Sequence, residues 1–111
     1  MGKFSRDKGA RFERQWRDSM REAGFPARRN PQAQGGRVAG ADVVGCGPFH
    51  VECKTGKRPN VRAALAQACD DASTGMVPAA VCHWDRGETI VAMRAEDWLD
   101  LVREWHERGE A

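Results

Sequence analysis

A small group of charged side chains between residues 42 and 54 has the types and spacing for chemistry on a phosphate. Residues 49–54, FHVECK, alternate strictly between apolar and polar, which predicts a strand with one polar face. His50, Glu52 and Lys54 share that face because side chains two apart on a strand point the same way. Asp42 lies ten residues before Glu52, across a short turn. The pattern therefore predicts two carboxylates and an ammonium converging at one place.

Two carboxylates held close together repel each other unless a cation lies between them. Mg²⁺ favours oxygen ligands, retains waters and commonly joins protein carboxylates to phosphate. An ammonium such as that of Lys54, beside a metal-bound water, can hold or help deprotonate the attacking nucleophile. The simpler alternative is a surface strand on which Glu52 and Lys54 form an ordinary ion pair.

The elements around this strand would position a further acid. Apolar residues recur every four positions from Phe12 to Met20 and predict a helix over residues 8–23. Glu13 on this helix is a candidate for the same site. Its simpler alternative is an i+4 pair with Arg17, worth only tenths of a kcal/mol.

The sequence as a whole predicts strands and helices in one domain spanning residues 1–111. The order helix, three strands, helix, two strands, helix predicts a mixed α/β fold with a central sheet. Residues 1–7 are expected to be a flexible N-terminus, and residues 31–41, rich in Gly and Gln, a mobile loop. The expected strands are 25–30, 42–46, 49–54, 78–84 and 89–93, and the further helices are 60–73 and 95–107.

The charge of the chain is unevenly distributed. The 111 residues hold 18 Lys+Arg and 16 Asp+Glu, a net charge of +2. Residues 1–60 carry 13 basic and 6 acidic side chains, a net of +7, whereas residues 61–111 carry 5 and 10, a net of −5. This asymmetry predicts a polyanionic partner on one side of the molecule.

The sequence gives little support for a membrane protein, a secreted protein or a protein held by zinc or disulfides. No apolar run reaches the length needed to cross a bilayer, and the N-terminus lacks the apolar stretch of a secretory signal, so we expect a cytoplasmic protein without membrane contact. The four cysteines form no CxxC pair. They are expected to be small buried thiols rather than zinc ligands or disulfides.

Several of these features, taken in order, resemble a known family. Asp42, followed after nine residues by Glu52-Cys53-Lys54, resembles the PD-(D/E)xK nuclease signature. KGARFER at 8–14, GFPARR at 24–29 and the Gly-rich loop resemble the archaeal-type Holliday junction resolvases. The resemblance covers residues 8–54, and beyond residue 60 only the order of elements agrees. Ala41 replaces the usual proline, and Cys53 replaces the usual apolar residue.

The resemblance implies a restriction-endonuclease-like core and a Mg²⁺ ion, with Mn²⁺ able to substitute. Asp42 and Glu52 would bind the metal with help from the backbone carbonyl of Cys53. Lys54 would orient the water or stabilise charge on the phosphate, and Glu13 would complete the site. The implied reaction is in-line attack of metal-activated water on a phosphodiester, giving a 5′-phosphate.

The resemblance also implies a DNA partner, and more specifically a homodimer that cuts four-way junctions or other branched DNA. Arg29 matches an arginine near the scissile phosphate. Two alternatives stay open: a nuclease of flaps, ends or duplex, and a non-catalytic nucleic-acid-binding module. A nuclease this compact would suit a virus or mobile element. The expected DNA-binding residues are Lys8, Arg28, Arg29, Gln34, Arg37, Lys57 and Arg58.

Overall fold

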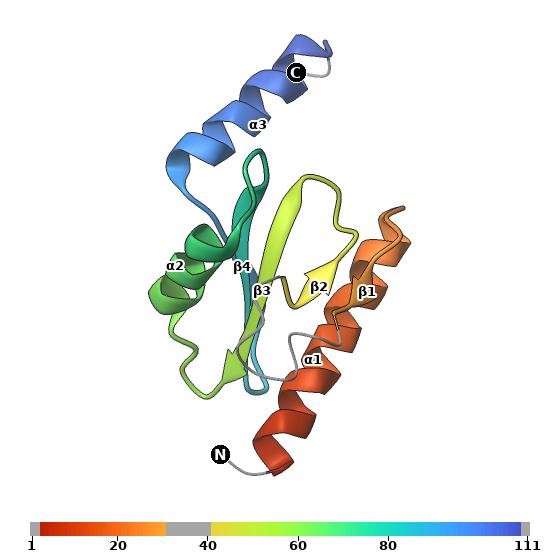
Figure 1. Ribbon diagram of the computed structural model, residues 1–111, viewed down its shortest axis with the longest axis vertical. Coiled ribbons are helices and arrows are strands. Elements are labelled where there is room, and N and C mark those ends of the chain that lie inside the picture. Colours follow the sequence, from red (N-terminus) through yellow and green to blue (C-terminus); the bar gives the residue numbers. More distant parts are fainter. Residues whose placement is uncertain (1–2, 31–40, 110–111) are drawn as a thin grey trace.

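The computed structural model describes residues 3–30 and 41–109 of the chain. Its element order confirms the predicted one (Figure 1). The elements are α1 (Lys3–Glu22), β1 (Arg28–Arg29), β2 (Val43–Val44), β3 (Phe49–Gly56), α2 (Val61–Asp71), β4 (Val77–Trp84), β5 (Thr89–Ala92) and α3 (Ala95–Glu107).

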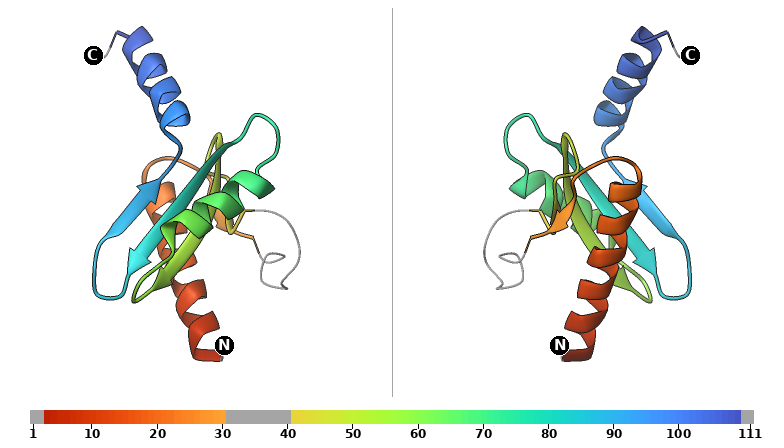
Figure 2. Two further views of the ribbon diagram at one scale, coloured as in Figure 1. Left: turned by 90° about the vertical axis from the view of Figure 1, so that its left-hand side faces the viewer. Right: turned by 90° about the vertical axis from the view of Figure 1, so that its right-hand side faces the viewer.

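The five strands form one mixed sheet in the order β1-β2-β3-β4-β5. β3 and β4 are parallel, and the other neighbouring strands are antiparallel. α2 is therefore the crossover between the two parallel strands. Figure 2 shows α1 along one face of the sheet and α2 on the opposite face. The α/β fold and the predicted hairpin of β2 and β3, with Val43 opposite Val51, are both confirmed.

The alternation of β3 separates two packed faces. Val51 packs with Phe12 and Val81 in the cluster beneath α1, as the alternation predicts. The other face packs against α2, where Ala64 and Ala80 are buried. A strand covered on both faces buries its polar side chains as well as its apolar ones.

His50 is the clearest correction that this packing makes to the sequence prediction. The alternation predicts His50 on a polar face of the strand, yet His50 is only 5% exposed. Period-2 alternation says which side chains share a face, but not whether a helix covers that face. Here α2 covers it.

The N-terminal helix is longer than expected. α1 begins at Lys3 rather than at residue 8, so the stretch expected to be flexible is helical from Lys3 onward. No proline interrupts residues 3–7, and the helix continues N-terminally through Gly9, which a helix tolerates at a cost of about 1 kcal/mol. The expected mobile loop lies mostly outside the described residues, except Ala41, which is buried.

α3 extends away from the sheet (Figure 1), and none of its described residues is buried. Trp98 and Trp105 are about half exposed, so these two large apolar side chains lie outside the hydrophobic core. All four cysteines are free thiols, and Cys46 and Cys82 are buried. Among the described helices, none combines the length and the apolarity that a bilayer crossing requires.

The turn between β2 and β3 holds the hairpin against the end of α1. Gly45 has φ +79°, and a Cβ there would collide with the backbone carbonyl of Pro26. Gly47 has φ +65°, and a Cβ would lie 2.8 Å from the ring of Phe25. Both glycines therefore permit a close approach that a larger residue would prevent.

We expect Gly45→Ala to lower the free energy of unfolding by about 3 kcal/mol, because it adds a backbone collision to the cost of a positive φ. Gly75→Ala is the matched control, since Gly75 has φ +89° with nothing within 4 Å of its Cβ position. That variant should lose only about 1 kcal/mol. Urea denaturation compares the two, and equal losses would contradict the collision.

Candidate active site

Asp42 is fixed beside β3 by the backbone. Its Oδ2 accepts a hydrogen bond from the backbone N–H of Cys53 at 2.9 Å, and its own N–H donates to the carbonyl of Val51 at 2.9 Å. These two bonds hold the carboxylate against the strand that carries Glu52. The structure thus brings together the two acids that the sequence pattern selected.

Glu52 is a buried carboxyl group in an acidic environment. Burial raises its pKa to about 8, with further contributions from the charges of Asp42 and Asp71 and from a hydrogen bond to Asp42. Burial also raises the pKa of Asp42, and the Cys53 N–H and the hydrogen bond with Glu52 oppose that increase. Burial and the neighbouring charges therefore favour the protonated form of Glu52 when no cation is bound.

Lys54 lies on the rim of this acid pair. Its side chain is exposed, and its positive charge lowers the pKa of Asp42. Together with Lys8 and Gly9 it lines a pocket of about 380 Å³ between α1 and the end of β3. Lys54 therefore places an ammonium where a phosphate could approach the carboxylates.

Glu13 reaches the site from α1 and is held by Arg29 of β1. Arg29 Nε lies 2.9 Å from Glu13 Oε1, and both side chains are mostly buried. The charge of Glu13 contributes to the raised pKa of Glu52, so the helix-borne acid is part of the same electrostatic environment. The Nε of Arg17 bonds to Asp18 instead.

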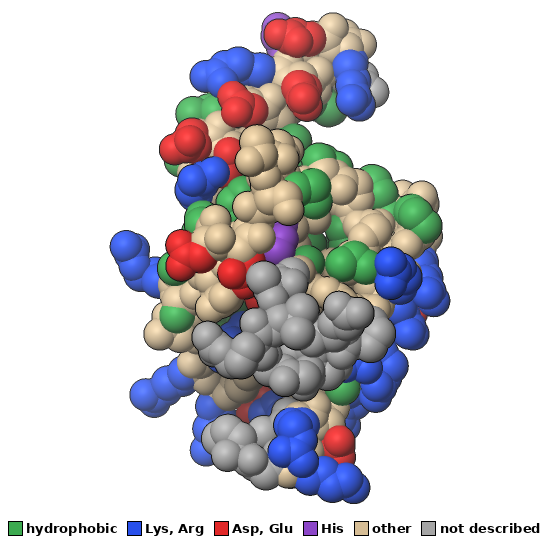
Figure 3. All heavy atoms as spheres, viewed as in Figure 1, with side chains coloured by type: hydrophobic (Ala, Val, Ile, Leu, Met, Phe, Trp, Pro, Cys, Tyr) green, Lys and Arg blue, Asp and Glu red, His purple; other side chains and the backbone are tan. Residues whose placement is uncertain are grey.

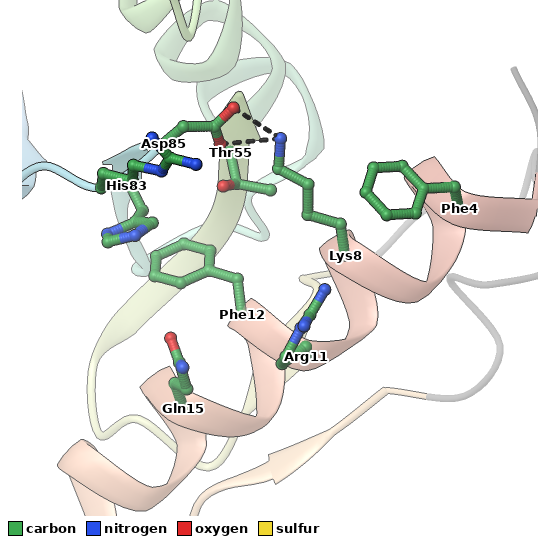
Figure 4. Close-up of a pocket in the computed structure, with 9 residues that line it drawn as sticks. Phe4, Lys8, Arg11, Phe12, Gln15, Thr55, His83 and Asp85 are labelled. Atoms are coloured by element: carbon green, nitrogen blue, oxygen red, sulfur yellow. Dashed lines mark hydrogen bonds and ion pairs between the residues drawn. The ribbon is translucent and has the colours of Figure 1, made fainter. Parts of the chain in front are cut away.

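Lys8 makes a different contact from the one the resemblance implies. Its Nζ lies 2.7 and 2.8 Å from the two carboxylate oxygens of Asp85. Asp85 belongs to the turn between β4 and β5. Figure 4 shows this pair above the ring of Phe12, which stacks on His83 with the ring centroids 5.3 Å apart. Lys8 thus ties α1 to the sheet, and its contact with DNA stays a prediction.

The other expected DNA-binding residues lie at the surface or outside the described part of the chain. Arg28, Lys57 and Arg58 are exposed, whereas Gln34 and Arg37 lie outside the described residues. On the face drawn in Figure 3, basic side chains gather on the side of α1, whereas most of the acidic side chains lie toward α2 and α3, where basic side chains are interspersed with them. This distribution follows the division between the two halves of the sequence.

Sequence reasoning left the roles of His50 and Gln67 open and missed Asp71 as a site residue. His50 Nε2 lies 3.1 Å from Glu52 Oε2, and burial lowers the pKa of His50. Asp71, at the end of α2, brings a carboxylate oxygen to within 4.8 Å of ligand atoms on both. Gln67 donates to Asp71 Oδ2 at 2.6 Å. One signal was present: Asp70 and Asp71 end a helix, where the macrodipole disfavours acids.

A scan of protein-family models and searches of curated proteins and of solved structures found no match to this chain. The geometry of the site therefore carries the functional argument. Strongly perturbed carboxyl groups beside a basic surface mark a candidate active site.

The raised pKa of Glu52 predicts a pH dependence of stability in the metal-free protein. A folded-state pKa near 8, above the unfolded value, means that folding favours the protonated form, so the contribution is complete at low pH and is lost as pH rises through about 8. Glu52→Gln keeps a neutral side chain of the same shape. In EDTA it should melt about 5 °C above wild type at pH 9, a difference of about 1 kcal/mol, and close to wild type at pH 5.

The exposed Glu88, in the turn before β5, supplies the control for this measurement. Glu88→Gln should melt with wild type at both pH values. A Glu52→Gln variant that melts below wild type at pH 9 would show that the ionised Glu52 carboxylate does not destabilise the fold, and it would contradict the raised pKa.

Proposed function

We propose that this protein is a metal-dependent endodeoxyribonuclease with a restriction-endonuclease-like core, acting on branched DNA such as a four-way junction. The observation that carries the proposal is the pairing of the half-buried Asp42 with the buried Glu52, beside the ammonium of Lys54. Two adjacent carboxyl groups in a basic region are suited to bind a divalent cation that also binds phosphate.

The donor set fits Mg²⁺, with Mn²⁺ as a substitute. Asp42 and Glu52 offer carboxylate oxygens, and the carbonyl of Cys53 is the third expected ligand. When bound, the ion supplies Lewis-acid stabilisation of the phosphate and a nucleophilic water at neutral pH. The Cys53 N–H already orients Asp42, so that ligand needs no rearrangement.

The neighbouring residues have distinct proposed roles. Lys54 holds the attacking water or stabilises charge on the phosphate. Arg29, already oriented by its bond to Glu13, faces a phosphate oxygen. Lys57 and Arg58 contact the DNA backbone, which makes affinity fall steeply with salt.

The decisive experiment is cleavage of four-way junctions, flaps and linear duplex in Mg²⁺ by wild type and two variants. Asp42→Asn and Glu52→Gln should each slow cleavage roughly a thousandfold, because several kcal/mol of metal-derived stabilisation are lost. DNA binding should persist or tighten, since negative charge near phosphate is removed. Asp100→Asn, on the exposed side of α3, should cleave as wild type does.

The same panel separates the alternatives. Preferential cutting of the junction supports the resolvase proposal, whereas similar rates on all three substrates favour a nuclease of flaps, ends or duplex. Binding without cleavage in either Mg²⁺ or Mn²⁺ favours the non-catalytic nucleic-acid-binding module.

Cutting two strands of a junction requires two sites, and we propose that a second copy of the chain packs on α3. Trp98, Val102 and Trp105 form an exposed apolar stripe on that helix. Beside it, Trp98 and Leu101 border an apolar pocket of about 380 Å³ against α1 and the sheet. A 13-residue helix depends on tertiary packing for its stability, and a second copy would supply it.

We expect wild type to sediment at twice the chain mass at micromolar concentration. Trp105→Asp should shift it to the monomer, because a charge would be buried in the contact. Arg103→Ala, on the same helix, should leave the dimer intact. A monomeric wild type would contradict the α3 contact.

A further inference from the structure

Glu52 has titratable neighbours on two of its sides. The residues on only one of these sides belong to the proposed nuclease site. Asp42 approaches from the hairpin. His50 and Asp71 approach on the face covered by α2, and together with Glu52 they place ligand atoms within 4.8 Å of one another. This second group combines an imidazole nitrogen with two carboxylates.

The separations suit ligands of one ion. His50 Nε2 and Glu52 Oε2 are 3.1 Å apart, and two adjacent ligands at about 2.1 Å from one ion lie roughly 3 Å from each other. His50 and Glu52 are both mostly buried, so their positions are set by packing rather than by solvent.

Asp71 is itself held by a neighbouring side chain. Gln67, one turn before it on α2, donates from Nε2 to Asp71 Oδ2 at 2.6 Å. Metal ligands characteristically have such outer partners, which orient the carboxylate toward the ion. An acid at this position also opposes the helix dipole, and a nearby cation would offset that cost.

The cluster is open to solvent from one side. His50 and Asp71 line a pocket of about 490 Å³ together with Ser73, Thr74 and Met76. A hydrated ion therefore has a route to His50 and Asp71 through this pocket, which Ala41 and Val44 of the hairpin also line.

We propose that His50, Glu52 and Asp71 bind a second divalent cation, with Glu52 shared between this ion and the one at Asp42. The proposal deepens the nuclease function and rests on it for the Asp42 ion. In enzymes that hold two metal ions about 4 Å apart, the two ions together stabilise the attacking and the leaving oxygens of phosphoryl transfer.

The imidazole determines which ion this site takes. Mg²⁺ prefers oxygen ligands alone, whereas Mn²⁺ and Zn²⁺ accept a nitrogen beside carboxylates. The second site is therefore selective for a transition-metal ion. It distinguishes Mn²⁺ from Mg²⁺, which the all-oxygen set at Asp42 does not.

The test counts Mn²⁺ ions by the loss of the free-ion EPR signal, with no DNA present. Wild type should bind two Mn²⁺ per chain, and Asp71→Asn should bind one. Asp70→Asn is the matched control, because Asp70 is the exposed neighbour on the same helix, and it should bind two. Gln67→Ala should bind the second ion about tenfold more weakly.

A spectroscopic measurement identifies the ligand. Pulsed EPR of bound Mn²⁺ should show nitrogen coupling in wild type and in His83→Gln, and none in His50→Gln. Circular dichroism checks the fold of each variant, and Asp71→Asn gives an independent count if His50→Gln does not fold. A single Mn²⁺ without nitrogen coupling in wild type, or two Mn²⁺ in folded Asp71→Asn, would overturn the proposal.

The two proposals fail in different ways. If cleavage depends on Mg²⁺ and Asp42 but wild type binds only one Mn²⁺, the second-site proposal is rejected and the nuclease proposal is retained. If wild type cuts no DNA but nitrogen-coupled Mn²⁺ persists in Asp42→Asn, the nuclease proposal is rejected and the His50 site is retained.

Discussion

The carboxyl group of Glu52 lies under α2 with other carboxylates on both sides, and the surrounding structure compensates for that arrangement. A buried carboxylate beside like charges is unstable unless it takes a proton or a cation. The acidic neighbours have partners of their own, since the Cys53 N–H binds Asp42, Gln67 donates to Asp71, and Arg29 pairs with Glu13. These surroundings favour the protonated form of Glu52 when no ion is bound, and a strongly perturbed carboxyl group of this kind is characteristic of functional sites.

The hydrophobic core and the candidate site depend on the same strand register. On β3, Val51 belongs to the cluster beneath α1, and Glu52 belongs to the opposite face. A slip of one residue would put the carboxyl group into the apolar cluster and a valine among the acids. The register is held by the eight parallel pairs with β4 and by the glycine turn before β3. Stability of the core therefore also specifies the position of the acids.

Local pattern was enough to predict the elements and the meeting of Asp42 with Glu52, because both follow from strand periodicity and a short turn. It was not enough for contacts that depend on packing. Alternation around His50 does not say that α2 covers it, and the bond between Lys8 and Asp85 joins residues 77 positions apart. Asp71 completes the cluster from another element, and its only local signal was an acid at the wrong end of a helix.

The basic side chains differ in whether they form an ion pair with a carboxylate. Lys8 and Arg29 are each bound to a carboxylate, so their charge serves mainly to hold α1 to the sheet and to orient Glu13. Within the described part of the chain, Lys54, Lys57 and Arg58 take part in no ion pair. These three follow directly after Glu52 in sequence, so part of the unpaired positive charge lies next to the acids that would hold the metal. A net charge of +2 hides this arrangement, because the acidic groups that cancel the basic ones lie mainly on other elements.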